Sequence, residues 1–384
     1  MRIVHVTLRF DAPGGVETTV REVARRQRAA GHDVAVYASD LVDEARWSRG
    51  TEFRPEVDGV PVRRFPVRKQ PLPGLNLPTM VGLGPALATS GADVLHAHSH
   101  RYGHVLQAAA VARRRRIPLV VSTHYHPADP WEPAWKRGLL RAEDLLFGAY
   151  AYRAARALVV ESEVERRLVE EFAPRERLRV VPPGIDLSEW GAPGADRPRA
   201  PELPSGYLLF VGRIAANKGL PTLFEALAKL PTGERPPLVL MGPPWGENPS
   251  LEQQARRLGI EDRLHWVGHV GDRRAYRATM RGASALVLPS AWEAFGLVLL
   301  EAMAARVPIV ASAVGAVPEV LEGGRAGRLV PYGDAGSLAE ALRAVKNDPL
   351  ATTRAVDRGT ERVQGFDWAT SVERLDAVYR AAMA

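Results

Sequence analysis

Two glutamates eight positions apart give the sequence its most informative pattern. Glu293 lies in a turn after an apolar run that ends at Leu288, and Glu301 lies in a predicted helix that is otherwise apolar. Because an unpaired carboxylate is costly to bury, we expect Glu301 to accept hydrogen bonds, and a vicinal diol suits its two oxygens. A pair of surface glutamates that cap the helix or form salt bridges is the alternative, and the spacing leaves it open.

Two cations follow another apolar run, at 207–211. Arg213 and Lys218 stand five positions apart, directly before a predicted helix. The planar fork of arginine and the compact charge of lysine suit the oxygens of a diphosphate. Lysine occurs at only five positions in the chain, which weakens the alternative of a solvated pair in a surface loop.

Gly14 and Gly15 precede a predicted helix, in the loop after the first predicted strand. Glycines there let the backbone approach a ligand phosphate or sugar without a Cβ in the way. An ordinary turn is the alternative, because the spacing does not match the dinucleotide pattern Gly-x-Gly-x-x-Gly.

Histidines gather after two further predicted strands. His96, His98 and His100 alternate at the end of one strand, and His124 follows the next. Alternating histidines suggest a zinc site. Their place at a strand end favours acceptor binding or simple packing over metal.

The elements that must position these residues alternate along the chain. In the first half, strands are predicted at 2–8, 33–38, 92–96, 118–123, 157–161 and 178–182, with helices at 17–30, 78–90, 103–115, 134–155 and 163–171. In the second half, strands are predicted at 207–212, 237–241, 264–267, 284–288, 307–311 and 327–330, with helices at 218–229, 249–258, 272–281, 296–305, 316–321 and 335–346. This alternation predicts parallel strands joined by right-handed crossovers. Glycine and proline over 183–206 indicate an interdomain linker, and Asp367 is the expected N-cap of a closing amphipathic helix.

Composition narrows the class of protein. A chain of 384 residues is long enough for two domains, and the lack of cysteine excludes disulfides, thiolate nucleophiles and cysteine-ligated metals. The net charge of +7 comes mostly from scattered arginine, so we expect no nucleic-acid partner. No signal peptide or membrane-spanning stretch is recognised, and we expect a cytoplasmic protein.

Contact with the inner face of the membrane stays open as an expectation. Trp131 and Trp135 lie in a proline-rich stretch and suit either a membrane surface, stacking on an acceptor sugar, or plain packing. The run Arg113–Arg116 ends a predicted helix, where a solvated helix end is favoured over lipid phosphate binding.

These segments together resemble the signature of retaining GT-B glycosyltransferases, especially glycosyltransferase family four. The matching segments are Pro13-Gly14-Gly15-Val16-Glu17, His124, Pro182-Pro183-Gly184-Ile185-Asp186, Val211-Gly212-Arg213 with Lys218-Gly219, Glu293-Ala294-Phe295-Gly296 with Glu301-Ala302-Met303-Ala304, and Gly315-Ala316-Val317-Pro318-Glu319. Pro183 departs from the family, which usually has Asn there.

The resemblance implies an α/β fold of the GT-B type, with two Rossmann-like domains whose parallel sheets face a central cleft. Residues 1–186 would form an acceptor-binding domain, with the helix 367–384 packed back on it. Residues 187–366 would form the nucleotide-sugar-binding domain.

The resemblance also implies roles for individual residues. The catalytic set would be Glu293, Arg213, Lys218 and His124. Arg213 and Lys218 would hold the donor diphosphate, Glu293 a sugar hydroxyl and Glu301 the ribose, with His124 beside the sugar. Further donor contacts would come from Gly14, Gly15, Ala294, Phe295, Gly296 and Leu297, with Val270 against the base.

The implied activity is retaining transfer of a hexose-type unit from a UDP- or GDP-sugar to a glycan, lipid or small-molecule acceptor. The chain contains no Asp-x-Asp sequence to hold a divalent metal, so we predict a metal-independent enzyme without a cofactor other than its donor substrate. A non-catalytic sugar-nucleotide or glycan-binding protein on the same scaffold is the main alternative, and a GT-B epimerase or phosphorylase is another.

Overall fold

The computed structural model describes residues 1–384 except 44–46, 51–52, 69–77, 130–131, 192–202 and 245–247. Trp131 and the centre of the expected linker therefore lie outside the described residues. The chain forms two compact units: unit 1 is Met1–Pro183 with Trp368–Ala384, and unit 2 is Gly184–Asp367. The sequence placed the division after residue 186, and contacts place it after residue 183.

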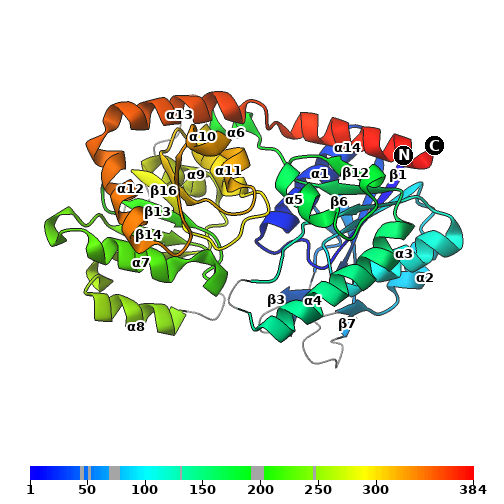
Figure 1. The fold of residues 1–384 in the computed structure, drawn as a ribbon. Coiled ribbons are helices and arrows are strands. Elements are labelled where there is room, and N and C mark those ends of the chain that lie inside the picture. Colours follow the sequence, from blue (N-terminus) through cyan, green and yellow to red (C-terminus); the bar gives the residue numbers. More distant parts are fainter. Residues whose placement is uncertain (44–46, 51–52, 69–77, 130–131, 192–202, 245–247) are drawn as a thin grey trace. The chain divides into compact units, whose positions relative to one another are not determined.

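Unit 1 is built on an eight-stranded sheet with the order β12-β11-β10-β9-β1-β2-β6-β5 (Figure 1). Its strands are β1 (Arg2–Thr7), β2 (Asp33–Ser39), β5 (Glu56–Val57), β6 (Val60–Phe65), β9 (Val94–His98), β10 (Leu119–Ser122), β11 (Ala157–Val160) and β12 (Leu178–Val180). All neighbours are parallel except β5 and β6. Strands β9, β10 and β11 are buried along their whole length, as expected for parallel strands covered on both faces.

Helices cover both faces of this sheet because alternate strand residues point to opposite sides. Val4 belongs to one apolar core, and its neighbour Ile3 belongs to the other, which also contains Trp368 and Leu375. The helices are α1 (Gly15–Ala29), α2 (Leu83–Ala88), α3 (Gly103–Arg115), α4 (Ala134–Phe147), α5 (Glu163–Val169) and α14 (Trp368–Met383). Helices α1 and α14 lie side by side on one face (Figure 1). Two short antiparallel pairs, β3 (Leu41–Asp43) with β4 (Ser48–Arg49) and β7 (Val67–Arg68) with β8 (Thr79–Met80), complete unit 1.

Unit 2 has a six-stranded parallel sheet with the order β15-β14-β13-β16-β17-β18. Its strands are β13 (Leu208–Val211), β14 (Leu238–Met241), β15 (Leu264–Gly268), β16 (Ala285–Leu288), β17 (Ile309–Ser312) and β18 (Arg328–Val330). Its helices are α6 (Leu187–Trp190), α7 (Leu220–Lys229), α8 (Asn248–Leu258), α9 (Arg273–Gly282), α10 (Leu297–Ala304), α11 (Val317–Val320), α12 (Ala335–Asn347) and α13 (Pro349–Val363).

The strand orders locate the place where each unit can bind a ligand. In unit 1 the order reverses direction between β1 and β9, and in unit 2 it reverses between β13 and β16. Ligands of doubly wound sheets bind beyond the carboxyl ends of the strands at such switch points. The loops after β1, β9, β13 and β16 are therefore the first places to examine.

Two helices are much shorter in the structure than the ranges predicted from the sequence. The helix expected over 78–90 reduces to α2, because Pro78 is followed by strand β8 and Gly82 has a left-handed φ of 83° at the helix N-cap. The helix expected over 134–155 ends as α4 at Phe147 and continues as a π-helix over Gly148–Tyr152.

Several elements were not anticipated: the short strands β3, β4, β5, β7 and β8, the strand β6, and the helices α6 and α13. Strand β6 begins with a Val-Pro pair, and proline normally argues against a strand interior. Helix α13 follows α12 after Asp348, which caps it by accepting from the N–H of Ala351 at 3.0 Å. The short helix α6 interrupts the segment expected to be a linker, with Asp186 as its N-cap.

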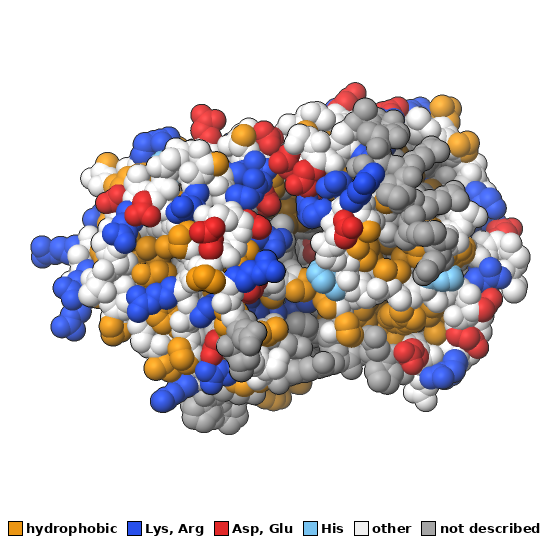
Figure 2. All heavy atoms as spheres, turned by 180° about the vertical axis from the view of Figure 1, so that it is seen from behind, with side chains coloured by type: hydrophobic (Ala, Val, Ile, Leu, Met, Phe, Trp, Pro, Cys, Tyr) orange, Lys and Arg blue, Asp and Glu red, His pale blue; other side chains and the backbone are white. Residues whose placement is uncertain are grey.

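Surface charge and helix length give two further observations. Basic and acidic side chains are interspersed on the face drawn in Figure 2. Among the described helices, none combines the length and apolar character that crossing a membrane would require.

Candidate active site

The loops that follow β13 and β16 lie against each other at the switch point of unit 2. The N–H of Ala291 donates to the carbonyl of Asn217 at 2.8 Å. Gly219 has a φ of 66°, and a Cβ built there would lie 1.9 Å from the carbonyl oxygen of Pro289. Only glycine allows this approach, so Gly219 holds the cation loop against the glutamate loop.

Lys218 and Glu293 form an ion pair across these two loops. The Nζ of Lys218 lies 2.6 Å from Oε1 of Glu293, and their side chains are 16% and 12% exposed. The hydroxyl of Ser290 donates to the same Oε1 at 2.6 Å. The N–H of Ala316 donates to the carbonyl of Glu293 at 3.0 Å, which ties the turn to a third loop. The structure thus brings together two residues that are 75 positions apart in the sequence.

Arg213 and the start of α10 complete the edge of this site. Arg213 lies two residues beyond β13 and is partly exposed. Gly296 is the N-cap of α10, so the N–H groups of the first turn, from Leu297 onward, lie next to the Glu293 turn. The N–H of Leu299 already donates to the carbonyl of Gly296 at 2.8 Å, and the N–H groups before it in this turn favour an anion. Phe295 is 4% exposed and packs against Phe366, so it can offer a ligand only its backbone.

The carboxylate of Glu301 on α10 accepts a hydrogen bond, as its apolar surroundings require. The donor is the hydroxyl of Tyr276 on α9, 2.5 Å from Oε2 of Glu301. Burial raises the pKa of Glu301, and the hydrogen bond from Tyr276 partly offsets this effect. Burial and the nearby carboxylate also raise the pKa of Tyr276 well above its usual value.

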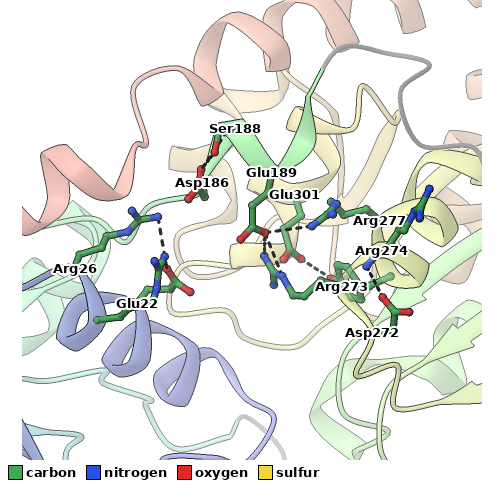
Figure 3. Close-up of polar contacts among 12 residues, drawn as sticks. Glu22, Arg26, Asp186, Ser188, Glu189, Asp272, Arg273, Arg274, Arg277 and Glu301 are labelled. Carbon is green, nitrogen blue, oxygen red and sulfur yellow. Dashed lines mark hydrogen bonds and ion pairs between the residues drawn. The ribbon is translucent and has the colours of Figure 1, made fainter. Parts of the chain in front are cut away.

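Charged side chains from α6 and α9 surround Glu301 in Figure 3. Glu189 on α6 pairs with Arg273, and also with Arg277 at 3.4 Å. Asp272 caps α9 by accepting from the N–H of Arg274 at 2.7 Å (Figure 3). Arg273 favours the charged form of Glu301, whereas the carboxylate of Glu189 opposes it.

Val270 and Ala294 lie near the same edge of unit 2. Val270 follows β15 and packs, partly buried, against the core cluster that contains Phe295. Ala294 is partly exposed in the Glu293 turn. The expected donor residues of unit 2 therefore occupy the loops after β13, β15 and β16 and the helix α10.

In unit 1, the glycine loop after β1 is tied to the start of α1. A Cβ at Gly14 would lie 2.0 Å from Oε2 of Glu17, whereas a Cβ at Gly15 would meet nothing within 4 Å. Glu17 forms an ion pair with Arg9 at 2.6 Å, with both side chains 9% exposed. A side chain at Gly14 would therefore have to displace the carboxylate of Glu17, and the open space at Gly15 is where a ligand can approach.

The side chain of His124 is buried under the carboxyl edge of the unit 1 sheet. It is 5% exposed, and its Nδ1 lies 3.0 Å from Oε1 of Glu161. Its backbone has a φ of 41°, and Ser99 and Arg101 after β9 also have positive φ values, 85° and 59°. Positive φ is uncommon for residues other than glycine and costs of order 1–3 kcal/mol each, and such strain concentrates at functional sites.

His5, His96, His98 and His100 are interior residues. Packing therefore explains them, and an open surface that faces an acceptor does not. His100 is 6% exposed and bonds Asp144 at 2.7 Å and Tyr152 at 2.6 Å. His5, His96 and His98 come within 4.8 Å of one another through ring nitrogens. Each of their six nitrogens has a hydrogen-bond partner, so the arrangement is complete without a metal.

Sequence reasoning missed Tyr276, Ser290, Glu189 and His5 as parts of these sites. Ser290 lies three residues before Glu293, a spacing that allows a side-chain contact. Of these four residues, Ser290 is the one whose role the sequence could have indicated. The other three depend on contacts between separate elements.

Two family models together match most of the chain. Residues 13–189 match Glycosyltransferase Family 4, and residues 196–362 match Glycosyl transferases group 1. The chain is 32% identical to D-inositol 3-phosphate glycosyltransferase 1 of Catenulispora acidiphila, covering 96% of this chain and 91% of that protein. It is 30% identical to the phosphatidyl-myo-inositol mannosyltransferase of Mycolicibacterium smegmatis, with 96% and 91% covered.

Solved structures of the same fold cover almost the whole chain. Anabaena HepE in complex with UDP and glucose has a TM-score of 0.79 at 21% identity, covering 99% of this chain and 100% of that one. Sucrose-phosphate synthase from Thermosynechococcus elongatus has a TM-score of 0.75 at 23% identity, with 99% and 98% covered. The expected α/β fold of the GT-B type is confirmed, and the chain belongs to glycosyltransferase family 4.

Proposed function

We propose that the protein is a retaining hexosyltransferase that uses a UDP- or GDP-sugar, without a metal ion. The observation that carries this proposal is the pairing of Lys218 with Glu293, beside Arg213, at the switch point of unit 2. Unit 2 would bind the donor, and unit 1 would hold a glycan, lipid or small-molecule acceptor.

The cations act on the leaving group. Glycosyl transfer develops negative charge on the departing diphosphate, so Lys218 and Arg213 stabilise the transition state more than the bound donor. The N–H groups at the start of α10 add to this field. Binding this charge through protein cations is the reason for proposing metal independence.

The two glutamates hold donor hydroxyls. Glu301 would accept hydrogen bonds from the ribose, with Tyr276 fixing its orientation. Glu293 would hold a hydroxyl of the donor sugar. Its Oε1 already accepts from both Lys218 and Ser290, which weakens it as a nucleophile and favours positioning of the sugar over a covalent bond to it.

The names of similar proteins guide the choice of donor and acceptor. HepE was solved with UDP-glucose and with UDP and glucose, so UDP-glucose is the first donor to test. Relatives at 30% identity or more are named for inositol phosphate and phosphatidylinositol acceptors. An acceptor that carries a cyclic polyol is therefore the first class to screen.

Thermal unfolding with UDP, GDP, ADP and dTDP identifies the base. A nucleotide at 100 times its Kd stabilises the native state by about 2.7 kcal/mol, a clear rise in melting temperature. A shift with one nucleotide but no turnover with any sugar would favour the non-catalytic binding protein. No shift with any of the four would contradict the donor site.

The anomeric configuration of the product tests retention. Starting from an α-configured donor, we expect an α-linked product, read from the anomeric proton coupling by NMR. Glu293→Gln should slow transfer without abolishing it. A β-linked product would overturn the retaining assignment, and a glycosyl ester on Glu293 would replace positioning with covalent catalysis.

Helix α4 supports peripheral contact with a membrane, where a lipid acceptor would lie. Trp135 is 70% exposed and Leu146 is 74% exposed on this helix. An apolar groove of about 600 Å³ beside α4 is lined by residues that include Leu106, Ala110, Leu139, Phe147 and Tyr150. Leu146→Glu should reduce flotation with anionic vesicles. Leu350→Glu, at a leucine 67% exposed on α13, is the matched control, and equal flotation of both variants would contradict the contact.

A further inference from the structure

A buried chain of hydrogen bonds begins at Asp376 on α14. The amide nitrogen of Gln27 on α1 donates to Oδ1 of Asp376 at 3.0 Å. A carboxylate only accepts, so the amide nitrogen must face Asp376. The amide oxygen of Gln27 then faces His5 and lies 2.9 Å from its Nε2. An amide oxygen cannot donate, so the proton of this bond belongs to His5.

The chain continues from β1 through β9 to the end of β10. Nδ1 of His5 lies 3.0 Å from Nε2 of His98, and Nδ1 of His98 lies 3.4 Å from Nε2 of His124. A neutral imidazole has one donor and one acceptor nitrogen. With its proton on Nε2, His5 accepts from His98, and His98 in turn accepts from His124. At the far end, the carboxylate of Glu161 accepts from Nδ1 of His124 at 3.0 Å.

We propose that this chain fixes His124 as an imidazolium ion that donates from both ring nitrogens. Asp376 and Gln27 are then positioning residues, which set the charge of His124 from the other end of the chain. The inference about protonation rests on the hydrogen bonds of unit 1 alone. What the charge does for catalysis rests on the proposed function.

The pKa shifts of these histidines agree with the protonation states that the hydrogen bonds require. Burial lowers the pKa of His5 to about 4 and that of His98 well below its usual value, so both are neutral at pH 7. Burial also opposes a charge on His124, but the carboxylate of Glu161, together with those of Glu165 and Glu17, outweighs it and raises the pKa of His124. The charge of His124 is therefore compensated locally.

Other titratable groups face His124 from the elements around it. Glu165 on α5 and Glu17 on α1 favour its charge. Glu165 accepts from the hydroxyl of Thr123 and the N–H of Tyr125, and burial raises its pKa to about 7. Glu17 is already paired with Arg9. On β9, His96 is neutral because burial lowers its pKa, with neighbouring histidines adding to the effect.

A fixed imidazolium changes the role of His124 in transfer. It has no lone pair left to accept the acceptor's proton, so it is not a general base. It supplies a permanent positive charge at the edge of unit 1, where it would favour an anionic group of donor or acceptor. The acceptor proton must then pass to another group, such as the departing phosphate.

A single isosteric substitution at Asp376 should reverse the direction of the hydrogen bonds between Gln27 and His124. Met1 bonds Nδ1 of His32 through its amino group, so His32 carries its proton on Nε2 and donates to Asp376. In Asp376→Asn, the amide oxygen must keep that contact, and the new amide nitrogen faces Gln27. Gln27 then turns over and donates to His5. Each bond between Gln27 and His124 reverses, while the carboxylate of Glu161 still accepts from Nδ1 of His124. His124 then becomes an acceptor at Nε2 and loses its charge.

Nitrogen-15 correlation spectra of the histidine rings in the full-length protein test this directly. At pH 7 we expect His124 to show the imidazolium pattern, with His5 and His98 neutral and protonated at Nε2. The signals are assigned from His124→Gln and His98→Gln spectra. In Asp376→Asn, His124 should become neutral, and His5 and His98 should move their protons to Nδ1.

Glu373→Gln is the matched control, because it removes the same charge from an exposed position of the same helix. It should leave all three tautomers unchanged. A neutral His124 in the unmodified protein at pH 7 would overturn the proposal, even if Asp376→Asn failed to fold. An imidazolium that persists in folded Asp376→Asn would also contradict it. The measurement needs neither donor nor acceptor, so failure of the proposed function would leave the result intact.

Discussion

The two units place a positive charge at the carboxyl edge of their sheets by opposite means. In unit 2 the charge belongs to Lys218, which is cationic by residue type and pairs with Glu293 at a site 16% and 12% exposed. In unit 1 the inferred charge belongs to His124, whose residue type permits either state. Its protonation depends on a chain that ends at Asp376, 252 positions away in the sequence.

The comparison teaches that the two sites should fail differently. Loss of Lys218 removes the charge itself and should leave the fold of unit 2 intact, because Ser290 still donates a hydrogen bond to Glu293. Loss of a link in the unit 1 chain strands buried polar groups and therefore affects stability as well as charge. The predictions below separate these effects.

The largest effect is expected for Lys218→Ala. Removing one group that stabilises a developing charge typically lowers kcat by about 10²–10³-fold. Initial rates with a saturating donor measure this, with Lys229→Ala, an exposed lysine at the end of α7, as the control. Near-normal turnover in Lys218→Ala would place the diphosphate elsewhere.

Gln27→Leu should act mainly on stability. Gln27 is fully buried, and its loss strands the Nε2 proton of His5 and one oxygen of Asp376. Each stranded group costs about 1–3 kcal/mol. Hydrogen exchange of the β1 and β9 amides measures this cost in unit 1 alone.

The matched control for Gln27→Leu lies in unit 2. Gln254 makes one exposed contact, to the carbonyl of Pro221 at 3.2 Å, and Gln254→Leu should change stability by no more than about 0.5 kcal/mol. Equal protection of β1 amides in Gln27→Leu and the unmodified protein would show that the chain contributes nothing to unit 1.

Most of the fold could be predicted because it depends on local patterns. Runs such as 119–121 and 285–288 are continuous apolar segments between helical patterns, and both became parts of buried parallel strands. Strand β6 was missed because Pro61 argues against a strand, although its position near the edge of the sheet tolerates it. Helix α13 was missed because it follows α12 almost without a break.

The candidate sites were predictable to the extent that residue type carries the chemistry. Lys218, Glu293 and Glu301 stand out by charge and spacing, and the structure pairs the first two directly. Tyr276 does not stand out, because its contact with Glu301 joins two helices. The histidine chain is invisible for the same reason: the sheet register sets His5 beside His96, and α14 supplies Asp376 from the other end of the sequence.

A third prediction concerns the buried carboxylate of unit 2. Burial raises the pKa of Glu301 above its ordinary value of 4.5, so the folded state binds its proton more tightly than the unfolded state. Stability from this group is therefore lost as pH rises from about 4.5 through the folded pKa. Glu301→Gln keeps an acceptor for Tyr276 and should raise the melting temperature at pH 7 while reducing stabilisation by the nucleotide.

Thermal unfolding with and without nucleotide measures both effects. Glu340→Gln, an exposed glutamate on α12, is the control and should change neither. A Glu301→Gln variant that binds nucleotide as the unmodified protein does would remove Glu301 from the donor site. One that is less stable at pH 7 would show that Arg273 and the hydrogen bond from Tyr276 outweigh burial at Glu301.

The smallest effect is expected from metals, and it tests both halves of the comparison. In unit 2 the diphosphate would meet Lys218, Arg213 and the start of α10, so EDTA should leave the initial rate unchanged. In unit 1 the ring nitrogens of His5, His96 and His98 all have hydrogen-bond partners, so Zn²⁺ must break these bonds to bind. Added Zn²⁺ should therefore leave the melting temperature unchanged.

Activity lost with EDTA and restored by Mg²⁺ or Mn²⁺ would show that protein cations alone do not hold the diphosphate. A rise in melting temperature with Zn²⁺ that is absent in His98→Gln would show that the histidines form a metal site, and the fixed proton chain through His124 would then be replaced by metal coordination.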